Sequence, residues 1–189
     1  MTQEHDRYFE YLMRRSRLGH AYRRHVLYPR LVKRLRGRLL DVGCGIGDML
    51  AFRPDSVGVD INERTVAYCR ERGHEAHVMQ PDRLPFDVAS FDSVLLDNVL
   101  EHIAQPAPLL AEVHRVLAAG GRLLVGVPGV RGWHSDPDHK VFYDQATLVE
   151  RLHGAGFMPA ELFHMPLFRS AWLSERVRQY CIYGAFDRP

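Results

Sequence analysis

Residues 39–50 read LLDVGCGIGDML, in which an apolar run and an aspartate lead into three glycines at alternate positions, Gly43, Gly45 and Gly47. Glycine permits sharp turns and lets a ligand approach the backbone closely. Such loops hold the pyrophosphate of a dinucleotide when they read GxGxxG, but Asp48 stands where the third fingerprint glycine would be. A carboxylate there would repel a pyrophosphate lying on the helix N-terminus. The loop therefore predicts a ligand without phosphates.

A second carboxylate lies at the end of the next predicted strand. Residues 56–62 read SVGVDIN, which places Asp60 at the C-terminal tip of that strand. In a doubly wound sheet this tip lies beside the glycine loop, and an acid there can bind both hydroxyls of a ribose. A ligand with a ribose, no pyrophosphate and a positive charge would satisfy both sites, and S-adenosylmethionine is such a molecule.

The elements that must position these residues are short apolar runs that alternate with helical patterns. Strands are expected at 37–42, 56–60, 74–79, 91–96 and 121–127, and helices at 48–52, 63–72, 106–117 and 145–153. This alternation is typical of a parallel sheet with helices on both faces. Two further strands are expected at 157–163 and 179–186, joined by a helical stretch at 171–178, with the final strand inserted antiparallel beside its predecessor. The predicted fold class is α/β, a Rossmann-like seven-stranded sheet that is mostly parallel with an antiparallel last strand.

The length and composition favour a single soluble domain. A chain of 189 residues is long enough to bury a core, and 46% hydrophobic with 25% charged residues is ordinary for a globular protein. The N-terminal residues show no apolar segment of a signal peptide, and no apolar run approaches the length of a membrane span. Cys44, Cys69 and Cys181 show no CxxC spacing, so neither a disulfide framework nor a zinc site is predicted. A cytoplasmic protein is expected.

Four blocks of the sequence, in order, resemble the class I S-adenosylmethionine-dependent methyltransferases, especially the small bacterial group that includes the ubiquinone and menaquinone biosynthesis methyltransferases. The blocks are LLDVGCGIG at 39–47, VGVDIN at 57–62, LPFDVASFDSVLLDNVLEHI at 84–103 and LLAEVHRVLAAGGRLLVGVP at 109–128. The resemblance implies S-adenosylmethionine as the cofactor and methyl transfer as the activity.

The resemblance also implies roles for individual residues. The three glycines would pass beneath the methionine part of the cofactor, with Asp41 supporting the turn and the amino group, and Asp60 would bind the ribose. Asp97 and Asn98 would lie beside the methionine moiety and the transferred methyl; an ordinary helix cap is the alternative for this pair. The complete expected cofactor-binding set is Asp41, Gly43, Cys44, Gly45, Gly47, Asp60, Ile61, Gln80, Asp82, Asp97 and Asn98.

One position departs from the family pattern. Where relatives carry an aspartate that accepts a hydrogen bond from the adenine amino group, this chain has Gln80. The side-chain oxygen of Gln80 can accept the same bond without charge assistance. Asp82, two residues further on, is the alternative partner.

Residues 128–144, PGVRGWHSDPDHKVFYD, gather polar and aromatic side chains in a Gly- and Pro-containing loop after the fifth predicted strand. A loop of this length with its own polar cluster favours a functional role. We expect His139 or His134 to act as a general base or as an anchor for the acceptor. His102, in the sequence LEHI, is a further candidate, and capping or packing roles are the alternatives. No second ligand group of recognisable spacing accompanies the loop, so no metal site is predicted.

The N-terminal residues are strongly basic. Residues 1–38 carry eleven Lys and Arg against three Asp and Glu, whereas the rest of the chain is net acidic. The apolar spacing over residues 7–36 predicts helices interrupted near Gly19 and Pro29. This block, residues 1–36, resembles the helical lid that small methyltransferases add over the acceptor pocket of the core, residues 37–189. Its arginines would suit a phosphate or carboxylate on the acceptor, with a solvated helix face as the alternative. They are Arg14, Arg15, Arg17, Arg23 and Arg24.

Together these patterns predict an S-adenosylmethionine-dependent methyltransferase that acts by in-line displacement on a small-molecule or a lipid- or sugar-linked acceptor. One fold hosts many acceptors, so neither the acceptor nor the methylated atom follows from these patterns. A non-catalytic S-adenosylmethionine-binding protein or partner subunit of the same fold is the alternative. Asp48 disfavours a nucleotide-dependent oxidoreductase, and the sequence contains no recognisable RNA-binding module.

Overall fold

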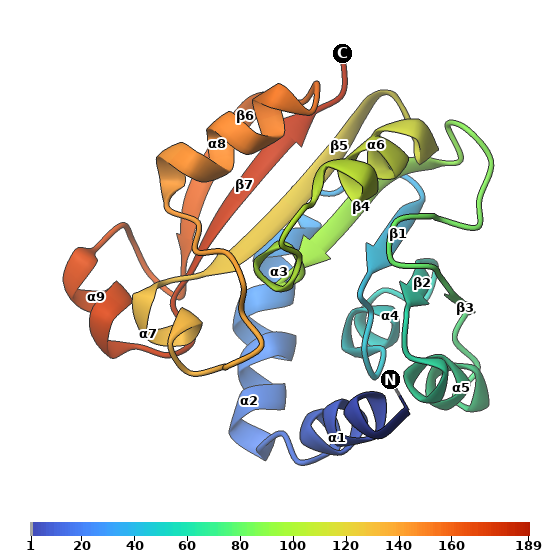
Figure 1. Ribbon diagram of the computed structural model, residues 1–189, viewed down its shortest axis with the longest axis horizontal. Helices are drawn as coiled ribbons and strands as arrows, with labels where there is room; N and C mark the ends of the chain where they lie inside the picture. Colours follow the sequence, from blue (N-terminus) through green and yellow to red (C-terminus); the bar gives the residue numbers. More distant parts are fainter. Residues whose placement is uncertain (1) are drawn as a thin grey trace.

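A seven-stranded sheet forms the centre of the computed structural model, which describes the backbone of residues 2–189 and the side chains of residues 7–189 (Figure 1). The order across the sheet is β3-β2-β1-β4-β5-β7-β6. The first five strands pair in parallel, and β7 lies antiparallel between β5 and β6. The predicted fold class, including the antiparallel last strand, is confirmed. The strands are β1 (Leu39–Val42), β2 (Val57–Asp60), β3 (Ala76–Val78), β4 (Phe91–Asp97), β5 (Leu117–Pro128), β6 (Met158–Met165) and β7 (Cys181–Asp187).

Helices connect these strands and also precede the first of them. The N-terminal helices are α1 (Thr2–Met13), α2 (Arg17–Tyr22), the π-helix η1 (Arg23–Leu27) and α3 (Tyr28–Val32). The helices between strands are α4 (Asp48–Phe52), α5 (Glu63–Glu71), the 3-10 helix η2 (Leu100–His102), α6 (Ala107–Val116), α7 (Val130–Trp133), α8 (Gln145–Gly154) and α9 (Ala171–Arg176).

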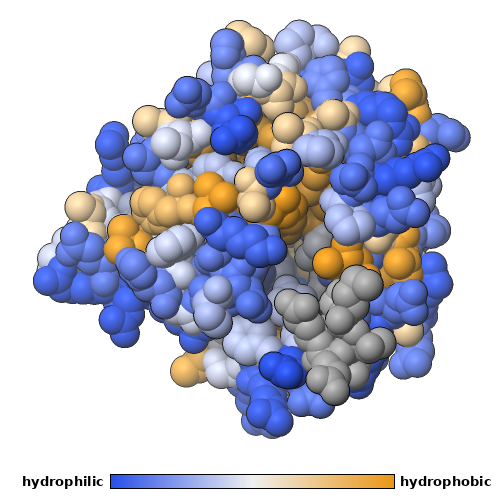
Figure 2. All heavy atoms as spheres, viewed as in Figure 1, coloured by the Kyte–Doolittle hydropathy of each residue, from blue (hydrophilic) through white to orange (hydrophobic). Residues whose placement is uncertain are grey.

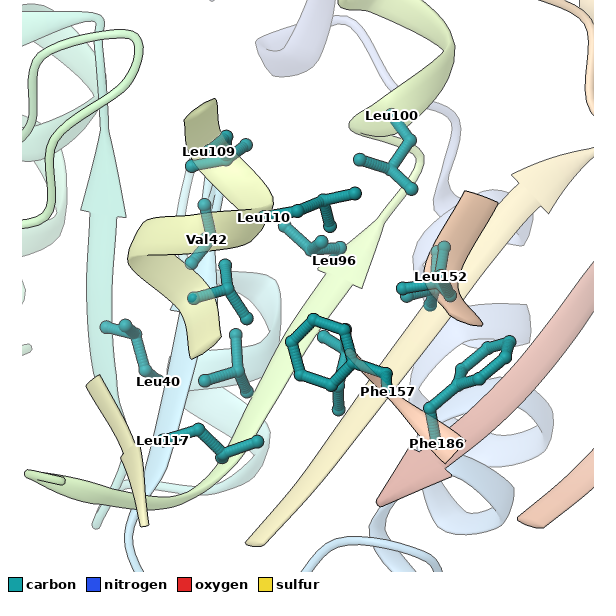
Figure 3. Close-up of a cluster of buried hydrophobic side chains, with 14 of the residues drawn as sticks. Leu40, Val42, Leu96, Leu100, Leu109, Leu110, Leu117, Leu152, Phe157 and Phe186 are labelled. Carbon is teal, nitrogen blue, oxygen red and sulfur yellow. The ribbon is translucent and has the colours of Figure 1, made fainter. Parts of the chain in front are cut away.

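Helices α6 and α8 cover one face of the sheet (Figures 1 and 3). Leu109, Leu110 and Val113 of α6 recur at helical spacing and are at most 2% exposed. Leu152 of α8 and Phe157, just after it, are fully buried in the same cluster. Burial of each such side chain contributes about 1.5–3 kcal/mol, which holds both helices against the strands.

The opposite face is covered by η1, α3, α4 and α5. Leu27, Leu31 and Met49 pack there against Leu95 of β4 and Leu124 of β5. Because both faces are covered, the central strands read as continuous apolar runs rather than as alternating patterns. This explains why the sequence predicts these strands so closely.

The N-terminal helices are interrupted within a few residues of Gly19, as the sequence predicts. The interruption lies between α1 and α2, because Ser16 caps α2 by accepting a hydrogen bond of 3.1 Å from the Gly19 N–H. Gly19 itself lies inside α2, and the break at residues 14–16 comes just before it. Pro29 lies in the first turn of α3, where a missing N–H costs no helical hydrogen bond.

The surface is mostly hydrophilic on the face drawn in Figure 2, with apolar side chains in small separate groups. Within residues 2–189, none of the helices combines the length and apolar character that a membrane span requires.

Candidate functional site

Three aspartates project from one face of the sheet at the C-terminal ends of adjacent parallel strands. Asp41 of β1 is paired in register with Gly58 of β2 and with Leu95 of β4. Side chains alternate between the faces along a strand. Asp60 and Asp97, each two residues beyond those partners, therefore point to the same face as Asp41. Ligands of open α/β sheets bind at this edge.

The glycine loop between β1 and α4 is closed by a hydrogen bond to the second of these aspartates. Gly43, Gly45 and Gly47 have φ angles of 75°, 52° and 79°, a left-handed conformation that disfavours residues with a Cβ. The Gly45 N–H donates to Asp60 Oδ2 at 2.9 Å, and the Asn62 N–H donates to Asp60 Oδ1 at 2.8 Å. Asp60 thus ties the glycine loop to the end of β2.

Asp41 lies beneath this loop and is buried, with 5% of its surface exposed. Burial raises the pKa of Asp41 well above its ordinary value, and the neighbouring carboxylates Asp97 and Asp60 raise it further. Among the side chains from residue 7 onward, none donates a hydrogen bond to the Asp41 carboxylate. A cationic group bound beside Asp41 would offset the cost of its burial.

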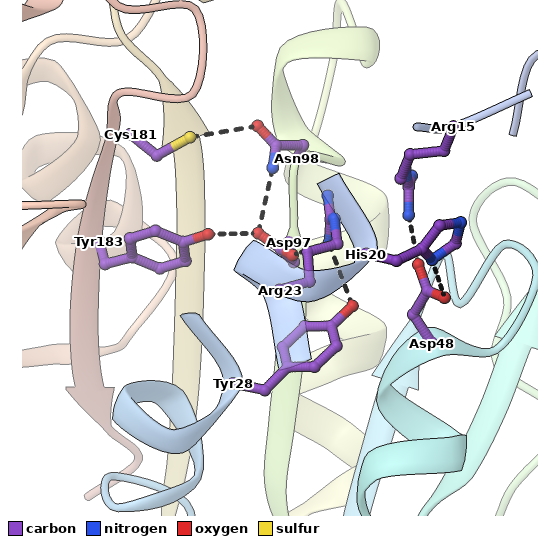
Figure 4. A network of polar contacts seen from close by, with 9 residues as sticks. All are labelled: Arg15, His20, Arg23, Tyr28, Asp48, Asp97, Asn98, Cys181 and Tyr183. Carbon is purple, nitrogen blue, oxygen red and sulfur yellow. Dashed lines mark hydrogen bonds and ion pairs between the residues drawn. The ribbon is translucent and has the colours of Figure 1, made fainter. Parts of the chain in front are cut away.

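Asp97, at the tip of β4, is the centre of a polar network (Figure 4). It accepts hydrogen bonds from Arg23 at 3.0 Å, from the Tyr183 hydroxyl at 2.6 Å and from the Asn98 side-chain amide at 3.0 Å. Burial, together with the Asp97 charge, raises the pKa of Tyr183 well above its ordinary value, so Tyr183 acts as a donor. The Cys181 thiol lies 3.8 Å from Asn98 Oδ1. The helix-cap alternative for Asp97 and Asn98 is not what the structure shows, because neither side chain caps η2.

A second ion pair joins the N-terminal helices to the glycine loop (Figure 4). Asp48, at the start of α4, pairs with Arg15, and His20 Nδ1 lies 3.4 Å from its other oxygen. Leu12 of α1 is 4% exposed, and a Cβ built on Gly45 would lie 3.1 Å from its methyl group. Helices α1 and α2 therefore lie directly over the loop.

The five arginines that were predicted to face the acceptor have different surroundings in the structure. Arg15 and Arg23 are engaged with the carboxylates of Asp48 and Asp97, so their charges are already balanced within the protein. Arg14, with 83% of its side chain exposed, lies 4.0 Å from Glu10.

The two predicted adenine partners lie just beyond β3. The Met79 N–H donates to the Asp60 carbonyl at 3.0 Å, which places Gln80 next to the end of β2. The side chains of Gln80 and Asp82 are exposed and line a groove of about 910 Å³ that also includes Arg115. Ile61, the remaining residue of the predicted set, is 46% exposed beside Asp60.

The three candidate histidines do not lie together. His102 of η2 and His139 face each other with ring centroids 4.7 Å apart, whereas His134 is exposed and packs on Trp133. The fully buried Glu101 lies beside the first pair, with its Oε1 3.9 Å from His139 Nε2. Burial raises the pKa of Glu101 to about 8, and the same cause, helped by His139, lowers the pKa of His102.

Three residues of the site are absent from the sequence-based set: Glu101, Cys181 and Tyr183. Arg15 and Arg23 were expected to face an acceptor, but they pair with Asp48 and Asp97. Glu101 had a local signal, because it adjoins His102 in a segment already singled out. Tyr183 and Cys181 had none, since their strand reaches β5 only through the antiparallel insertion of β7.

Comparison with known proteins agrees with this geometry. Residues 40–125 match the family model described as "Methyltransferase domain". The chain is 34% identical over 168 residues to a "Probable S-adenosylmethionine-dependent methyltransferase" of Mycolicibacterium smegmatis, which covers 82% of this chain and 65% of that protein. A protein of the same description from Mycobacterium tuberculosis is 34% identical over 165 residues, with coverages of 78% and 60%. A crystal structure of a methyltransferase from Thermotoga maritima has the same fold, with a TM-score of 0.71, 20% identity, and coverages of 100% and 96%.

The chain is similar in sequence to S-adenosylmethionine-dependent methyltransferases and has the fold of a solved member of that group. It spans only 60% to 65% of the length of these two curated mycobacterial relatives.

Proposed function

We propose that this protein binds S-adenosylmethionine at the C-terminal ends of β1, β2 and β4 and transfers its methyl group to a small-molecule or a lipid- or sugar-linked acceptor. The observation that carries the proposal is the hydrogen bond of 2.9 Å from the Gly45 N–H to Asp60. It joins a glycine loop unsuited to pyrophosphate to an acid placed to bind a ribose.

The residues at the C-terminal ends of these strands fit this cofactor. The buried Asp41 carboxylate suits the ammonium group of the methionine moiety, and Asp60 suits the ribose hydroxyls. A Cβ on Gly43 would lie 2.8 Å from a Val99 methyl group, so the loop passes too close to the segment between β4 and η2 for a larger residue. Gln80 is proposed to accept a hydrogen bond from the adenine amino group, with Asp82 as the alternative acceptor.

The cofactor supplies an activated methyl group on a sulfonium. What the protein must add is alignment of the acceptor with that methyl, exclusion of water and, for some acceptors, removal of a proton. Asp97 and Asn98 are proposed to lie beside the methyl group. His139, His102 and His134 are proposed as base or acceptor anchor, and only the first two share a buried environment with Glu101.

The N-terminal residues 1–36 are proposed to act as a lid. The contacts of Leu12 with Gly45, of Arg15 with Asp48 and of Arg23 with Asp97 support this role, because all of them join the N-terminal segment to residues of the proposed cofactor site. The engagement of two arginines with protein carboxylates leaves the exposed ones, such as Arg14, to attract an anionic acceptor. The finer likeness to ubiquinone and menaquinone biosynthesis methyltransferases stays a prediction.

Isothermal titration with S-adenosylhomocysteine, and with NAD in parallel, tests the cofactor. We expect saturable binding of S-adenosylhomocysteine and none of NAD. Replacing Asp60→Asn removes a charged acceptor, whose loss costs about 1.5–3 kcal/mol, or roughly a 10- to 100-fold weaker affinity. Asp55→Asn, which changes an acid with 70% of its side chain exposed, is the matched control and should leave binding unchanged. Binding of NAD alone would refute the proposal.

Turnover separates an enzyme from the alternative, a non-catalytic binding protein or partner subunit. Formation of S-adenosylhomocysteine should be followed with panels of hydroxyl, amine and carbon acceptors. His139→Ala and His134→Ala, compared at equal cofactor binding, then test the proposed bases. Unchanged turnover in both variants would remove these histidines from the mechanism.

A further inference from the structure

Three side chains with metal-binding chemistry converge just beyond β4. Glu101, His102 and His139 each offer one ligand atom, and these atoms all lie within 4.8 Å of one another. Glu101 and His102 belong to η2, whereas His139 comes from the loop after α7. We propose that these three residues form a binding site for a divalent first-row transition metal ion.

Glu101 is the first observation that calls for a cation. The residue is fully buried, yet in the part of the chain that the structure describes neither of its carboxylate oxygens has a hydrogen-bond partner. A buried carboxylate without donors is costly unless it is neutralised or coordinates a metal. Buried polar groups left without partners are rare in native proteins, and an ion or a water is the usual explanation.

His139 is oriented as metal-binding histidines are. Its Nδ1 lies 2.7 Å from the Trp133 carbonyl, so Nδ1 carries the proton and Nε2 is directed toward Glu101. A second ring nitrogen held by a backbone carbonyl is the usual way in which proteins orient a metal ligand. The distance of 3.9 Å from His139 Nε2 to Glu101 Oε1 is too long for a hydrogen bond. The imidazole of His139 and the carboxylate of Glu101 are therefore far enough apart for a metal ion to lie between them.

Two further polar side chains of this region also lack hydrogen-bond partners within residues 7–189. The hydroxyl of Tyr143 and the indole N–H of Trp133 are also buried without partners among the described residues. Two imidazoles and one carboxylate bound to a divalent ion leave a single net positive charge.

The ligand set indicates which ions fit. Two imidazoles and one carboxylate suit zinc, cobalt, nickel, manganese or ferrous iron, whereas magnesium and calcium prefer oxygen ligands. Two ligands bound to one such ion at about 2.1 Å each lie roughly 3–4 Å apart, so small side-chain shifts complete the site. Three protein ligands leave at least one position for water or for an oxygen of a bound molecule.

The site adjoins the proposed cofactor cleft but does not depend on it. The Asp97 charge contributes to the raised pKa of Glu101. The charges of Asp60 and Glu101 both help to raise the pKa of Tyr8, in α1. None of the three ligands belongs to the glycine loop or to the predicted ribose and adenine partners. Metal binding can therefore be measured separately from cofactor binding.

Titration of the EDTA-treated, dialysed protein with Co²⁺, followed by visible absorption, tests the site. We expect saturable binding with the ligand-field bands of a histidine-bound ion. Glu101→Gln, His102→Ala and His139→Ala should each weaken the association constant at least about tenfold. His153→Ala, which removes an exposed histidine of α8, is the control and should bind Co²⁺ as the parent protein does. No saturable binding, or binding unchanged in the Glu101 and His139 variants, overturns the proposal.

Two further measurements keep these outcomes distinct. The unfolding midpoint of each variant in EDTA shows whether it folds. Glu101→Gln keeps the side-chain volume and introduces no charge, so its metal-free form should be about as stable as the parent. Binding of S-adenosylhomocysteine in EDTA tests the proposed function alone. Loss of that binding in the parent refutes the cofactor proposal, whereas absence of Co²⁺ binding refutes the metal site.

Discussion

Arg23→Ala should destabilise this protein more than any exposed arginine substitution. Arg23 donates to the Asp97 carboxylate at 3.0 Å and to the Tyr28 hydroxyl at 3.1 Å, and the side chains of Arg23 and Asp97 are 23% and 7% exposed. Removing one partner of a buried ion pair costs about 3–5 kcal/mol, because the other charge remains buried. The partial exposure of Arg23 places the expected cost near the lower limit, about 3 kcal/mol.

Urea unfolding followed by circular dichroism measures this cost, with the m-value checked for constancy. For a chain of this length about 3 kcal/mol corresponds to a fall in Tm of roughly 6–12 °C. Arg14→Ala is the matched control, since the Arg14 side chain is 83% exposed and lies 4.0 Å from its only acidic neighbour among the described side chains, Glu10. We expect that control to stay within about 0.5 kcal/mol of the parent.

A double-mutant cycle separates the ion pair from lost packing. Asp97→Asn removes the charge but keeps the volume, so Arg23→Ala should cost much less in that background. A coupling energy of at least about 1 kcal/mol is expected. Additive effects, or a cost for Arg23→Ala no larger than for Arg14→Ala, would show that the reasoning is wrong.

Two further predictions concern the glycine loop and an acid-sensitive ion pair. Gly47→Ala should destabilise more than Gly73→Ala in chemical denaturation: both have a φ of 79°, but only at Gly47 would a Cβ meet the Cys69 sulfur, at 2.9 Å. Equal effects would contradict the steric argument. The hydrogen bond from Arg115 lowers the pKa of Glu112 to about 2. Above its ordinary pKa Glu112 therefore stabilises the fold, and this contribution is lost as the pH falls through about 2. Glu112→Gln should make the free energy of unfolding depend less steeply on pH in this acidic range. An unchanged pH dependence would exclude this role.

Much of the architecture follows from local patterns in the sequence. Strands β1, β2, β4 and β5 are apolar runs because helices cover both of their faces, so their positions could be predicted closely. The glycine loop and Asp60 also follow from spacing, since the end of one parallel strand lies beside the end of the next. The break expected near Gly19 is present, but the Ser16 cap, not the glycine, decides where α2 begins.

The sequence by itself determined the order of elements, the glycine loop, and the acids at the strand tips, because these depend on residues close together in the chain or on the regular geometry of parallel strands. Only the tertiary structure brought Arg23 to Asp97, Tyr183 to the same carboxylate, and His139 to Glu101. These contacts depend on how the N-terminal helices, the inserted strand β7 and the loop after α7 pack on the sheet. Packing of that kind arises from the fit of many buried side chains at once, which no local pattern records.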